Sequence, residues 1–194
     1  LTRAEIRRFV AGHEEKGGPW PRDPDGAPLY PGDDAVLSEA EIQERAQSDA
    51  PFALRLDMKA ALSRIGEPLT WPEFGAEGPA LFEPAKSIAV DAASWGDVVL
   101  ARKDTPTSYH LSVVVDDARQ GITDVLRGQD LYAATSVHRV LQHLLDLAEP
   151  RYRHHRLILG DDGRKLSKSN QDTSLRSLRE VGVTRADLRK FIGL

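Results

Sequence analysis

Apolar residues recur with helical spacing at the start of the chain. Residues 2–5 read Thr-Arg-Ala-Glu, a capping box, and apolar residues follow at intervals of three and four, so we expect a helix that ends before residue 17. Residues 38–41 form a second capping box, which predicts a short helix through about residue 46. Residues 17–34 are dense in proline, glycine and aspartate, a composition typical of an extended irregular loop.

The next part of the chain has shorter and mixed patterns. Residues 52–56 alternate between apolar and polar side chains, which predicts a β-strand. Residues 58–62 are compatible with a continuation of that strand or with a turn of helix. Prolines, glycines and three aromatic residues lie between residues 66 and 86, so we expect loops held in place by aromatic side chains. Up to residue 104 the sequence therefore predicts a small α+β region.

Longer apolar runs follow after residue 105. Residues 109–115 carry three consecutive valines, as expected of a strand buried on both faces of a parallel sheet, and residues 121–127 predict a second strand. Residues 157–159 predict a third, short and buried strand. Between the second and third strands lies an amphipathic helix that Asp130 or Thr135 could cap. Its apolar stripe consists of Val137, Val140, Leu141, Leu144, Leu145 and Ala148.

Two more helices are predicted near the end of the chain. One spans residues 175–181, and residues 184–187 carry the capping signal of the other. The order strand, strand, helix, strand, loop, helix is that of half an open α/β sheet. Since ligands of such sheets bind at the carboxyl ends of the strands, we expect Asp116, Arg127 and the loop after residue 159 to lie together.

The composition is typical of a soluble globular protein. The 194 residues are 40% hydrophobic and 29% charged, enough for one sizeable core or two small domains. No apolar run approaches the roughly 18 residues that cross a bilayer, and no signal peptide is recognisable, so we expect a cytoplasmic protein without membrane contact. The chain begins at Leu1 rather than at a methionine, and we expect it to be a processed or truncated piece.

Charge and cysteine content exclude several classes of site. Without cysteine the chain can form neither a disulfide nor a thiolate zinc site. A net charge of −4 argues against a generally basic nucleic-acid-binding surface, although a local basic patch is compatible with it. Residues 150–156 are the most basic segment, and they could contact a nucleic-acid phosphate or form a solvated charged edge before a buried strand.

Two lysines and two serines make up the loop Lys165-Leu166-Ser167-Lys168-Ser169, directly after a glycine- and aspartate-rich turn at residues 160–163. The two ammonium groups can close over a polyphosphate and neutralise the charge that grows when an α-phosphate is attacked. By itself, a Lys-x-x-Lys sequence is more often a solvated basic loop. The loop therefore predicts nucleotide binding only in combination with the motifs before it.

Three segments stand in order along the chain: Tyr-His-Leu-Ser-Val-Val-Val-Asp-Asp at residues 109–117, the run ending in Arg-Gly-Gln-Asp-Leu at residues 121–131, and the lysine loop. Together they resemble the second half of the catalytic domain of class I glutamyl-tRNA synthetases, whose KMSKS signature is similar to the lysine loop. The resemblance is strongest over residues 97–175 and weaker over residues 1–56. It implies an α/β fold in which residues 105–194 form the second half of a Rossmann-like nucleotide-binding domain, and residues 1–104 an inserted acceptor-binding α+β region.

The resemblance also implies roles for individual residues. Tyr109 and Arg127 correspond to the family's glutamate contacts, which is sensible because an arginine fork can hold a carboxylate while a phenol hydroxyl fixes its orientation. The residues implied for ATP binding are Lys168, Lys165, Ser167 and His154, of which the two lysines are also catalytic. Judged alone, Tyr109 could be a half-buried core tyrosine and Arg127 a partner of Asp116 or Asp130.

The chain departs from the family pattern in three places, one of which is the basic segment at residues 150–156. The family's His-x-Gly-His motif has no counterpart, since His13 and His110 lack its context. The inserted region of the family often carries a zinc site built from cysteines, whereas Tyr30 and Asp34 stand here without thiolates. We therefore predict no metal at this place and a loop held by the packing of Trp20 and Tyr30.

Within the family, the resemblance is to the short paralogues that lack an anticodon-binding domain, the glutamyl-Q tRNA(Asp) synthetases. It implies an enzyme that forms glutamyl-adenylate from L-glutamate and ATP with magnesium, and that transfers glutamate to the queuosine of tRNA(Asp). Because half of the active site is absent from these residues, we expect the chain alone to be inactive. Two alternatives are a fragment of a true glutamyl-tRNA synthetase and a non-catalytic synthetase-like binding module.

Overall fold

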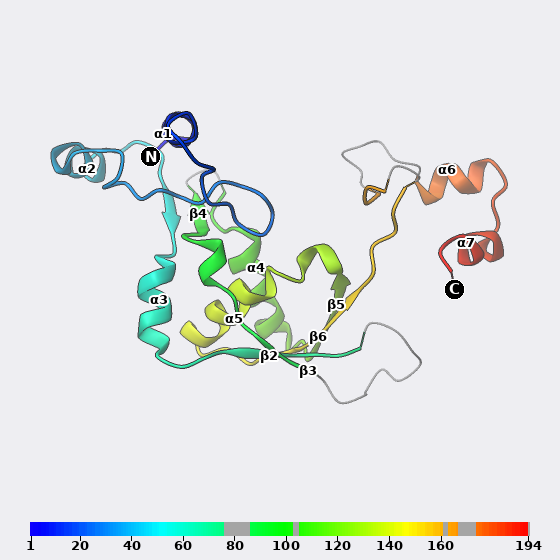
Figure 1. Cartoon of the computed structure of the whole chain (residues 1–194). Coiled ribbons are helices and arrows are strands. Elements are labelled where there is room, and N and C mark those ends of the chain that lie inside the picture. Colours follow the sequence, from blue (N-terminus) through cyan, green and yellow to red (C-terminus); the bar gives the residue numbers. More distant parts are fainter. Residues whose placement is uncertain (76–85, 103–104, 161–162, 167–173, 194) are drawn as a thin grey trace.

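The computed structural model describes residues 1–75, 86–102, 105–160, 163–166 and 174–193 (Figure 1). A central helix lies between a four-stranded mixed sheet and two further helices, and this body carries a helical region at one end and a pair of short helices at the other (Figure 1). Among the described residues, no helix is both long and apolar enough to cross a membrane.

The two capped helices predicted near the start of the chain are confirmed. Helix α1 (Arg3–Glu14) and helix α2 (Glu39–Ala46) each begin at a capping box in which the hydroxyl accepts from the third helical N–H. Arg45 of α2 donates two hydrogen bonds to Glu5 of α1, at 3.0 and 2.8 Å. This bidentate pair ties the two helices together.

The loop between these helices is held by aromatic side chains, as the sequence predicts. The Trp20 indole N–H donates to the Leu29 carbonyl at 2.9 Å, and its ring packs edge-on against Phe9 of α1. The guanidinium of Arg55 lies over the Tyr30 ring, 4.1 Å from its centroid. The absence of zinc from this loop stays a prediction.

A two-stranded antiparallel sheet follows, made of β1 (Ala53–Arg55) and β4 (Val99–Arg102). The segment after β1 is helix α3 (Met58–Ile65), so of the two alternatives that the sequence allows for residues 58–62, strand or helix, the helix is confirmed. Asp57 caps its start, and Gly66 ends it in the left-handed conformation with φ of 72°. A short 3-10 helix, η1 (Ala93–Trp95), precedes β4.

The four-stranded sheet has the order β3-β2-β6-β5. Strands β2 (Thr70–Glu73) and β3 (Lys86–Ala89) are antiparallel, while β6 (Arg151–His155) runs parallel to both β2 and β5 (Asp124–Gly128). The prediction of loops over residues 66–86 is therefore wrong for Thr70–Glu73 and for Lys86, whereas residues 66–69 and 74–75 are loop; residues 76–85 lie outside the described part. The second strand predicted before residue 128 is confirmed, although it begins at Asp124.

The third predicted strand is wrong, because the basic segment before it forms the strand instead. Tyr152 and His154 of β6 are 2% and 1% exposed, whereas Ile158 and Leu159 are 40% and 51% exposed. The buried positions of β6 alternate along the strand, as expected, but they carry a tyrosine and a histidine instead of aliphatic side chains. The strand therefore lacks the aliphatic run by which buried strands are usually recognised. Residues 151–155 are thus an inner strand of the sheet and not an edge before a buried strand, while contact of this basic segment with a nucleic-acid phosphate stays a prediction.

The first strand predicted after residue 105 is also wrong, because these residues form helix α4 (Tyr109–Gln120). The Ser108 hydroxyl accepts from the Leu111 N–H, and Gly121 ends the helix in the left-handed conformation. These caps and the packing of the helix outweigh the strand preference of the valines, of which Val114 alone is fully buried. Asp116 consequently lies within a helix and not at a strand end.

Helix α5 (Thr135–Leu144) occupies the centre of the body. Among the described residues no side chain caps it, so the predicted capping by Asp130 or Thr135 is wrong. Asp130 belongs to the short 3-10 helix η2 (Gln129–Leu131) instead. The predicted apolar stripe faces the core through Val137, Val140 and Leu141, while Leu145 is 46% exposed. The polar face is buried as well, since every residue from Thr135 to Gln142 is buried.

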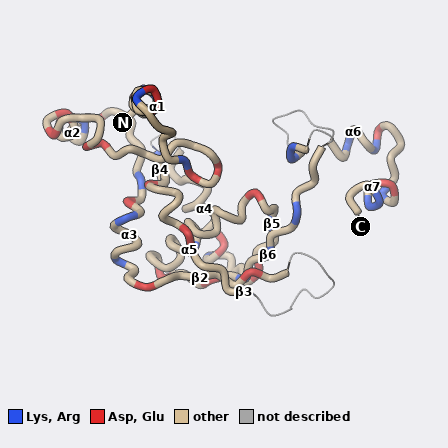
Figure 2. Tube along the Cα trace, in the orientation of Figure 1, with Lys and Arg blue, Asp and Glu red and all other residues tan. Residues whose placement is uncertain are grey.

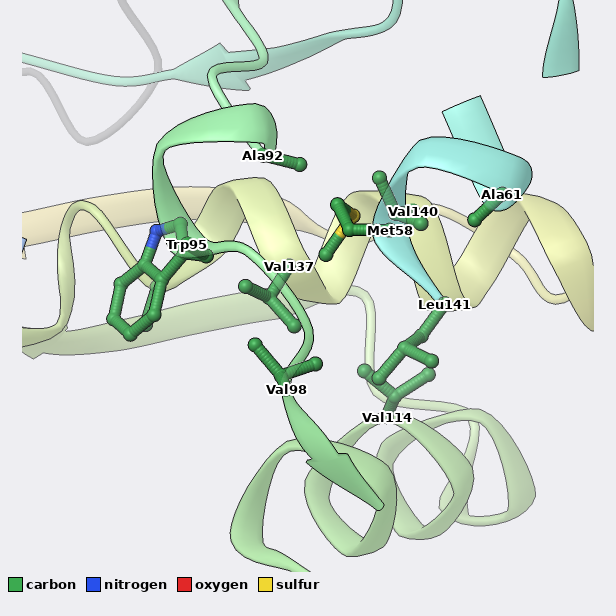
Figure 3. Packing of buried hydrophobic residues seen from close by; sticks show 10 residues of the cluster. Met58, Ala61, Ala92, Trp95, Val98, Val114, Val137, Val140 and Leu141 are labelled. Atoms are coloured by element: carbon green, nitrogen blue, oxygen red, sulfur yellow. The ribbon is translucent and has the colours of Figure 1, made fainter. Parts of the chain in front are cut away.

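The hydrophobic core gathers around α5. Figure 3 shows Val137, Val140 and Leu141 of α5 beside Met58 of α3 and Val114 of α4. Ala61, Ala92, Trp95, Val98 and Ala134 complete the buried cluster. Near the end of the chain, the two predicted helices are confirmed as α6 (Leu175–Glu180) and α7 (Arg185–Phe191). The division at residue 104 stays a prediction.

Candidate functional site

Arg127 lies at the centre of a hydrogen-bond network at the end of β5. Its backbone pairs with that of His154 on the neighbouring parallel strand β6, and Arg127 Nε donates to His154 Nε2 at 2.9 Å. Arg127 Nη2 donates to the Thr135 hydroxyl at 2.5 Å, and Nη1 lies 3.0 Å from His138 Nδ1. Both Thr135 and His138 come from α5, so strand and helix together fix the guanidinium.

Glu73 holds His154 from the other side. Because an arginine can only donate, His154 Nε2 accepts, and the ring proton must sit on Nδ1, which lies 2.9 Å from Glu73 Oε2. The second carboxylate oxygen accepts the His154 backbone N–H at 2.8 Å. Burial raises the pKa of Glu73, but the hydrogen bonds from His154 more than offset this effect, so the pKa lies below its ordinary value. Glu73 is therefore ionised at neutral pH.

His138 is a buried neutral base. Its side chain is 1% exposed, and burial, together with the charge of Arg127, lowers its pKa from 6.5 to about 2. His138 Nε2 lies 3.2 Å from His110 Nδ1 on α4. Burial also lowers the pKa of His110, so at neutral pH neither ring adds a positive charge next to Arg127.

Arg127 has no carboxylate partner among the described residues. The predicted alternative partners Asp116 and Asp130 do not bond to it, and Asp130 pairs with Lys165 instead. The Tyr152 ring lies 5.2 Å from the guanidinium carbon and supplies a cation–π contact. Three of the five guanidinium N–H groups are engaged, which leaves one on each terminal nitrogen. The guanidinium can therefore still receive a carboxylate at two points.

Tyr109 lies at the outer end of this network. It is the first residue of α4 and is 50% exposed, and it does not belong to the buried core cluster. Its ring packs edge-on against His110 and His138, with centroids 5.9 and 5.8 Å away. Tyr109 and Arg127 thus both contact His138.

A cavity of about 460 Å³ opens next to Tyr109. Its walls come from α4, from Trp95 and Asp97 before β4, and from the loop that carries Asp25 and Tyr30. The size is that of a small-molecule site, and the lining is mixed in polarity. Among the described residues, no three His, Cys, Asp or Glu side chains gather as metal ligands.

The lysine loop begins as a hairpin. The Gly160 N–H donates to the Arg164 carbonyl at 2.8 Å, and Gly163 adopts a φ of 74° that favours glycine. Lys165 Nζ lies 2.8 Å from Asp130 Oδ2, in the turn that follows β5. The hydrogen bond from Lys165 lowers the pKa of Asp130. Lys165 is thereby placed at the carboxyl end of the strand that carries Arg127, whereas Ser167 and Lys168 lie outside the described residues.

Four polar residues of the network are missing from the site residues predicted from the sequence: Glu73, Thr135, His138 and His110. His110 does not belong to a His-x-Gly-His motif, so the sequence alone predicts no role for it. The available signal was His138, an ionisable residue next to the apolar stripe of α5. Glu73 comes from a segment predicted to be loop, and no local pattern connects it with a residue 81 positions later in the chain.

Residues 82–194 match the family described as tRNA synthetases class I (E and Q), catalytic domain. The chain belongs to this family. Solved structures agree with the assignment of the fold: the crystal structure of glutamate-tRNA synthetase from Elizabethkingia anophelis has a TM-score of 0.57 and 20% identity, over 94% of this chain and 32% of that chain. The class I synthetase α/β fold predicted from the sequence is therefore confirmed.

Three curated relatives of this class I synthetase chain share one name. Glutamyl-Q tRNA(Asp) synthetase of Rhodobacter capsulatus is 41% identical over 88% of the chain and 60% of its own length. The protein of that name from Nitratidesulfovibrio vulgaris is 33% identical over 100% of the chain and 53% of its own length. In Xanthomonas campestris the identity reaches 63% over 39% of the chain and 25% of the relative. The chain thus spans little more than half the length of the first two relatives.

Proposed function

We propose that this chain supplies the glutamate contacts and part of the ATP site of an enzyme that activates L-glutamate with ATP and transfers it to the queuosine of tRNA(Asp). The names of the relatives support the choice of substrates. The observation that carries the proposal is the state of Arg127: its guanidinium is fixed on three sides by neutral groups and has two N–H groups left. A carboxylate ligand would complete this site.

Glutamate recognition rests on Arg127 and Tyr109. The free N–H groups of Arg127 can bind a substrate carboxylate with charge-assisted hydrogen bonds, which are about twice as strong as neutral ones. The half-exposed phenol of Tyr109 packs against His138, which in turn contacts Arg127, and the phenol can orient the ligand. Since His138 is uncharged at neutral pH, it holds the guanidinium without adding a second positive charge beside it.

ATP binding falls to the hairpin after β6. In the proposed reaction a glutamate carboxylate oxygen bonds to the α-phosphorus of ATP, and the bond to the departing pyrophosphate breaks. Lys165 and, by resemblance, Lys168 and Ser167 would stabilise the negative charge on the phosphate oxygens. Magnesium would be held largely by those oxygens. His154 has both ring nitrogens engaged by Arg127 and Glu73, so in this proposal it positions the glutamate contact Arg127 rather than binding ATP.

The last part of the chain has the charge expected of a tRNA contact. Residues 151–194 contain eleven lysines and arginines and five acidic residues, in a chain with a net charge of −4. Figure 2 shows blue segments along the hairpin, α6 and α7, away from the acidic α2. Lysines and arginines that bind tRNA phosphates displace the counterions around those phosphates. The affinity of this segment for tRNA should therefore fall as the salt concentration rises.

Isothermal titration of the 194-residue chain with L-glutamate tests the glutamate site. We expect binding that Arg127→Lys weakens by at least about tenfold, because lysine cannot form the bidentate fork. Arg119→Lys, an exposed position on α4, should leave the affinity unchanged. Equal binding by the Arg127 variant and the unsubstituted chain would refute the assignment.

The identity of the glutamate acceptor is tested with the whole protein that contains this chain. We expect glutamate-dependent ATP–pyrophosphate exchange, and transfer of labelled glutamate to tRNA(Asp) with queuosine but not to the same tRNA without it. Transfer to the 3′ end of tRNA(Glu) would instead indicate a true glutamyl-tRNA synthetase. Exchange activity that is absent despite glutamate binding would indicate a binding module.

A further inference from the structure

The hydrogen-bond network has only one direction in which its protons can be arranged. Arg127 is a donor at every nitrogen, so His138 Nδ1 must accept from it. A neutral imidazole carries one proton, which in His138 then sits on Nε2 and is donated to His110 Nδ1. His110 Nδ1 thereby accepts, and the single ring proton of His110 is on Nε2.

Neutrality of both rings is a consequence of where they lie. His138 is 1% exposed, and a second positive charge beside Arg127 would be unfavourable at this depth. For His110, burial lowers the pKa; Asp25 and Asp23 across the cavity oppose this effect, while Arg127 reinforces it, and the net pKa lies below the ordinary value. At neutral pH the arrangement of protons is therefore fixed from Arg127 outward.

The proton on His110 Nε2 is left without a partner among the described residues. The buried side-chain nitrogens and oxygens that lack a partner there include Trp95 Nε1 but not His110 Nε2, so solvent reaches the latter atom. His110 also lines the 460 Å³ cavity, next to Tyr109. An N–H group of known direction thus borders the same space as the phenol proposed to orient glutamate.

We propose that His110 is a further substrate-binding residue, which donates its Nε2–H to a carboxylate oxygen of the amino-acid substrate in the cavity. The proposal rests on the proposed function, because it takes the substrate class from there. His138 is then a positioning residue. It accepts a hydrogen bond from Arg127 and donates one to His110 Nδ1, which leaves the His110 proton on Nε2. The His110 Nε2–H and the Tyr109 hydroxyl can both donate to one ligand in this cavity, a combination that suits a carboxylate.

Nitrogen-15 NMR of the histidine rings in the 194-residue chain at neutral pH tests the proton arrangement directly. We expect the Nε2–H form for His110 and His138, and the Nδ1–H form for His154. Addition of L-glutamate should shift the His110 Nε2 and its proton, whereas the ring of exposed His143 should not respond. A His110 ring protonated on Nδ1 would overturn the inference without reference to activity.

Variants test the binding role. His110→Phe keeps the ring that packs on Trp95 and removes the donor, and we expect about 10- to 100-fold weaker L-glutamate binding. His138→Leu should also weaken binding, and His138→Gln should restore it, since an amide can accept from Arg127 and donate to His110. His143→Phe serves as the matched control on α5.

The outcomes separate the two proposals. If L-glutamate binds and Arg127→Lys weakens it while a folded His110→Phe chain binds normally, the His110 donor is refuted and the proposed function stands. If the unsubstituted chain does not bind L-glutamate at all, both fail. A selective loss with His110→Phe and rescue with His138→Gln support the donor chain, because a merely structural role would not depend on the direction of one hydrogen bond.

Discussion

Arg127 and His154 face each other across two parallel strands, and the arginine Nε donates to the histidine Nε2 at 2.9 Å. The register of β5 and β6 therefore sets the place of the guanidinium, and Glu73 sets the orientation of the histidine. A rigid sheet thus replaces the carboxylate that usually holds a partly buried arginine. This leaves the charge of Arg127 available for a ligand.

Replacement of His138 should change how stability depends on pH. The pKa of His138 is lowered from 6.5 to about 2 in the folded chain, so its contribution to stability is complete above pH 6.5 and is lost as pH falls toward 2. The loss is about 1.4 kcal/mol for each pH unit below 6.5. His138→Gln should remove this slope in urea unfolding curves, and His143→Gln should keep it.

Glu73→Gln should flatten the acid side of the same curve. The pKa of Glu73 lies below its ordinary value of 4.5, so its stabilising effect is present above pH 4.5 and disappears as pH falls through the folded-state pKa. The variant lacks this ionisation and should lose less stability on acidification. Thermal unfolding at several acidic pH values measures the effect, with exposed Glu67→Gln as control. An unchanged acid slope would contradict the prediction.

Lys165 and Asp130 should affect ATP binding in opposite directions. Lys165→Met removes a cation from the proposed phosphate site and should weaken ATP binding. Asp130→Asn removes the partner that competes for the same ammonium group, so it should strengthen binding. Titration of the chain with a fluorescent ATP analogue at low and high salt measures both. Weaker binding in both variants would indicate that the ion pair only positions the hairpin.

Met58→Ala should destabilise the chain by about 2–5 kcal/mol, since it leaves a cavity in the core between α3 and α5. Met58 is 2% exposed and is the only methionine in the chain. Leu54→Ala at a position that is 55% exposed should cost far less. Chemical unfolding of both variants gives the comparison, and equal losses would contradict the assignment of the core.

Local signals determined several elements before any tertiary contact was known. The capping boxes at Thr2, Ser38 and Thr184 predicted three helices, because a cap is completed within four residues of chain. The order of the motifs around Tyr109, Arg127 and Lys165 also identified the family, since the spacing of motifs is itself a property of the sequence. The roles of these three residues stay predictions.

The tertiary structure decided what depends on partners far apart in the chain. The valines of residues 113–115 favour a strand locally, yet capping by Ser108 and packing on α5 place them in a helix. Tyr152 and His154 form a buried strand because β5 and β2 lie on either side of it. The sequence by itself indicated Arg127 as a candidate site residue. Only the fold showed that Glu73, His138 and His110 belong to the same hydrogen-bond network, because hydrogen bonds between distant residues leave no periodic pattern in the sequence.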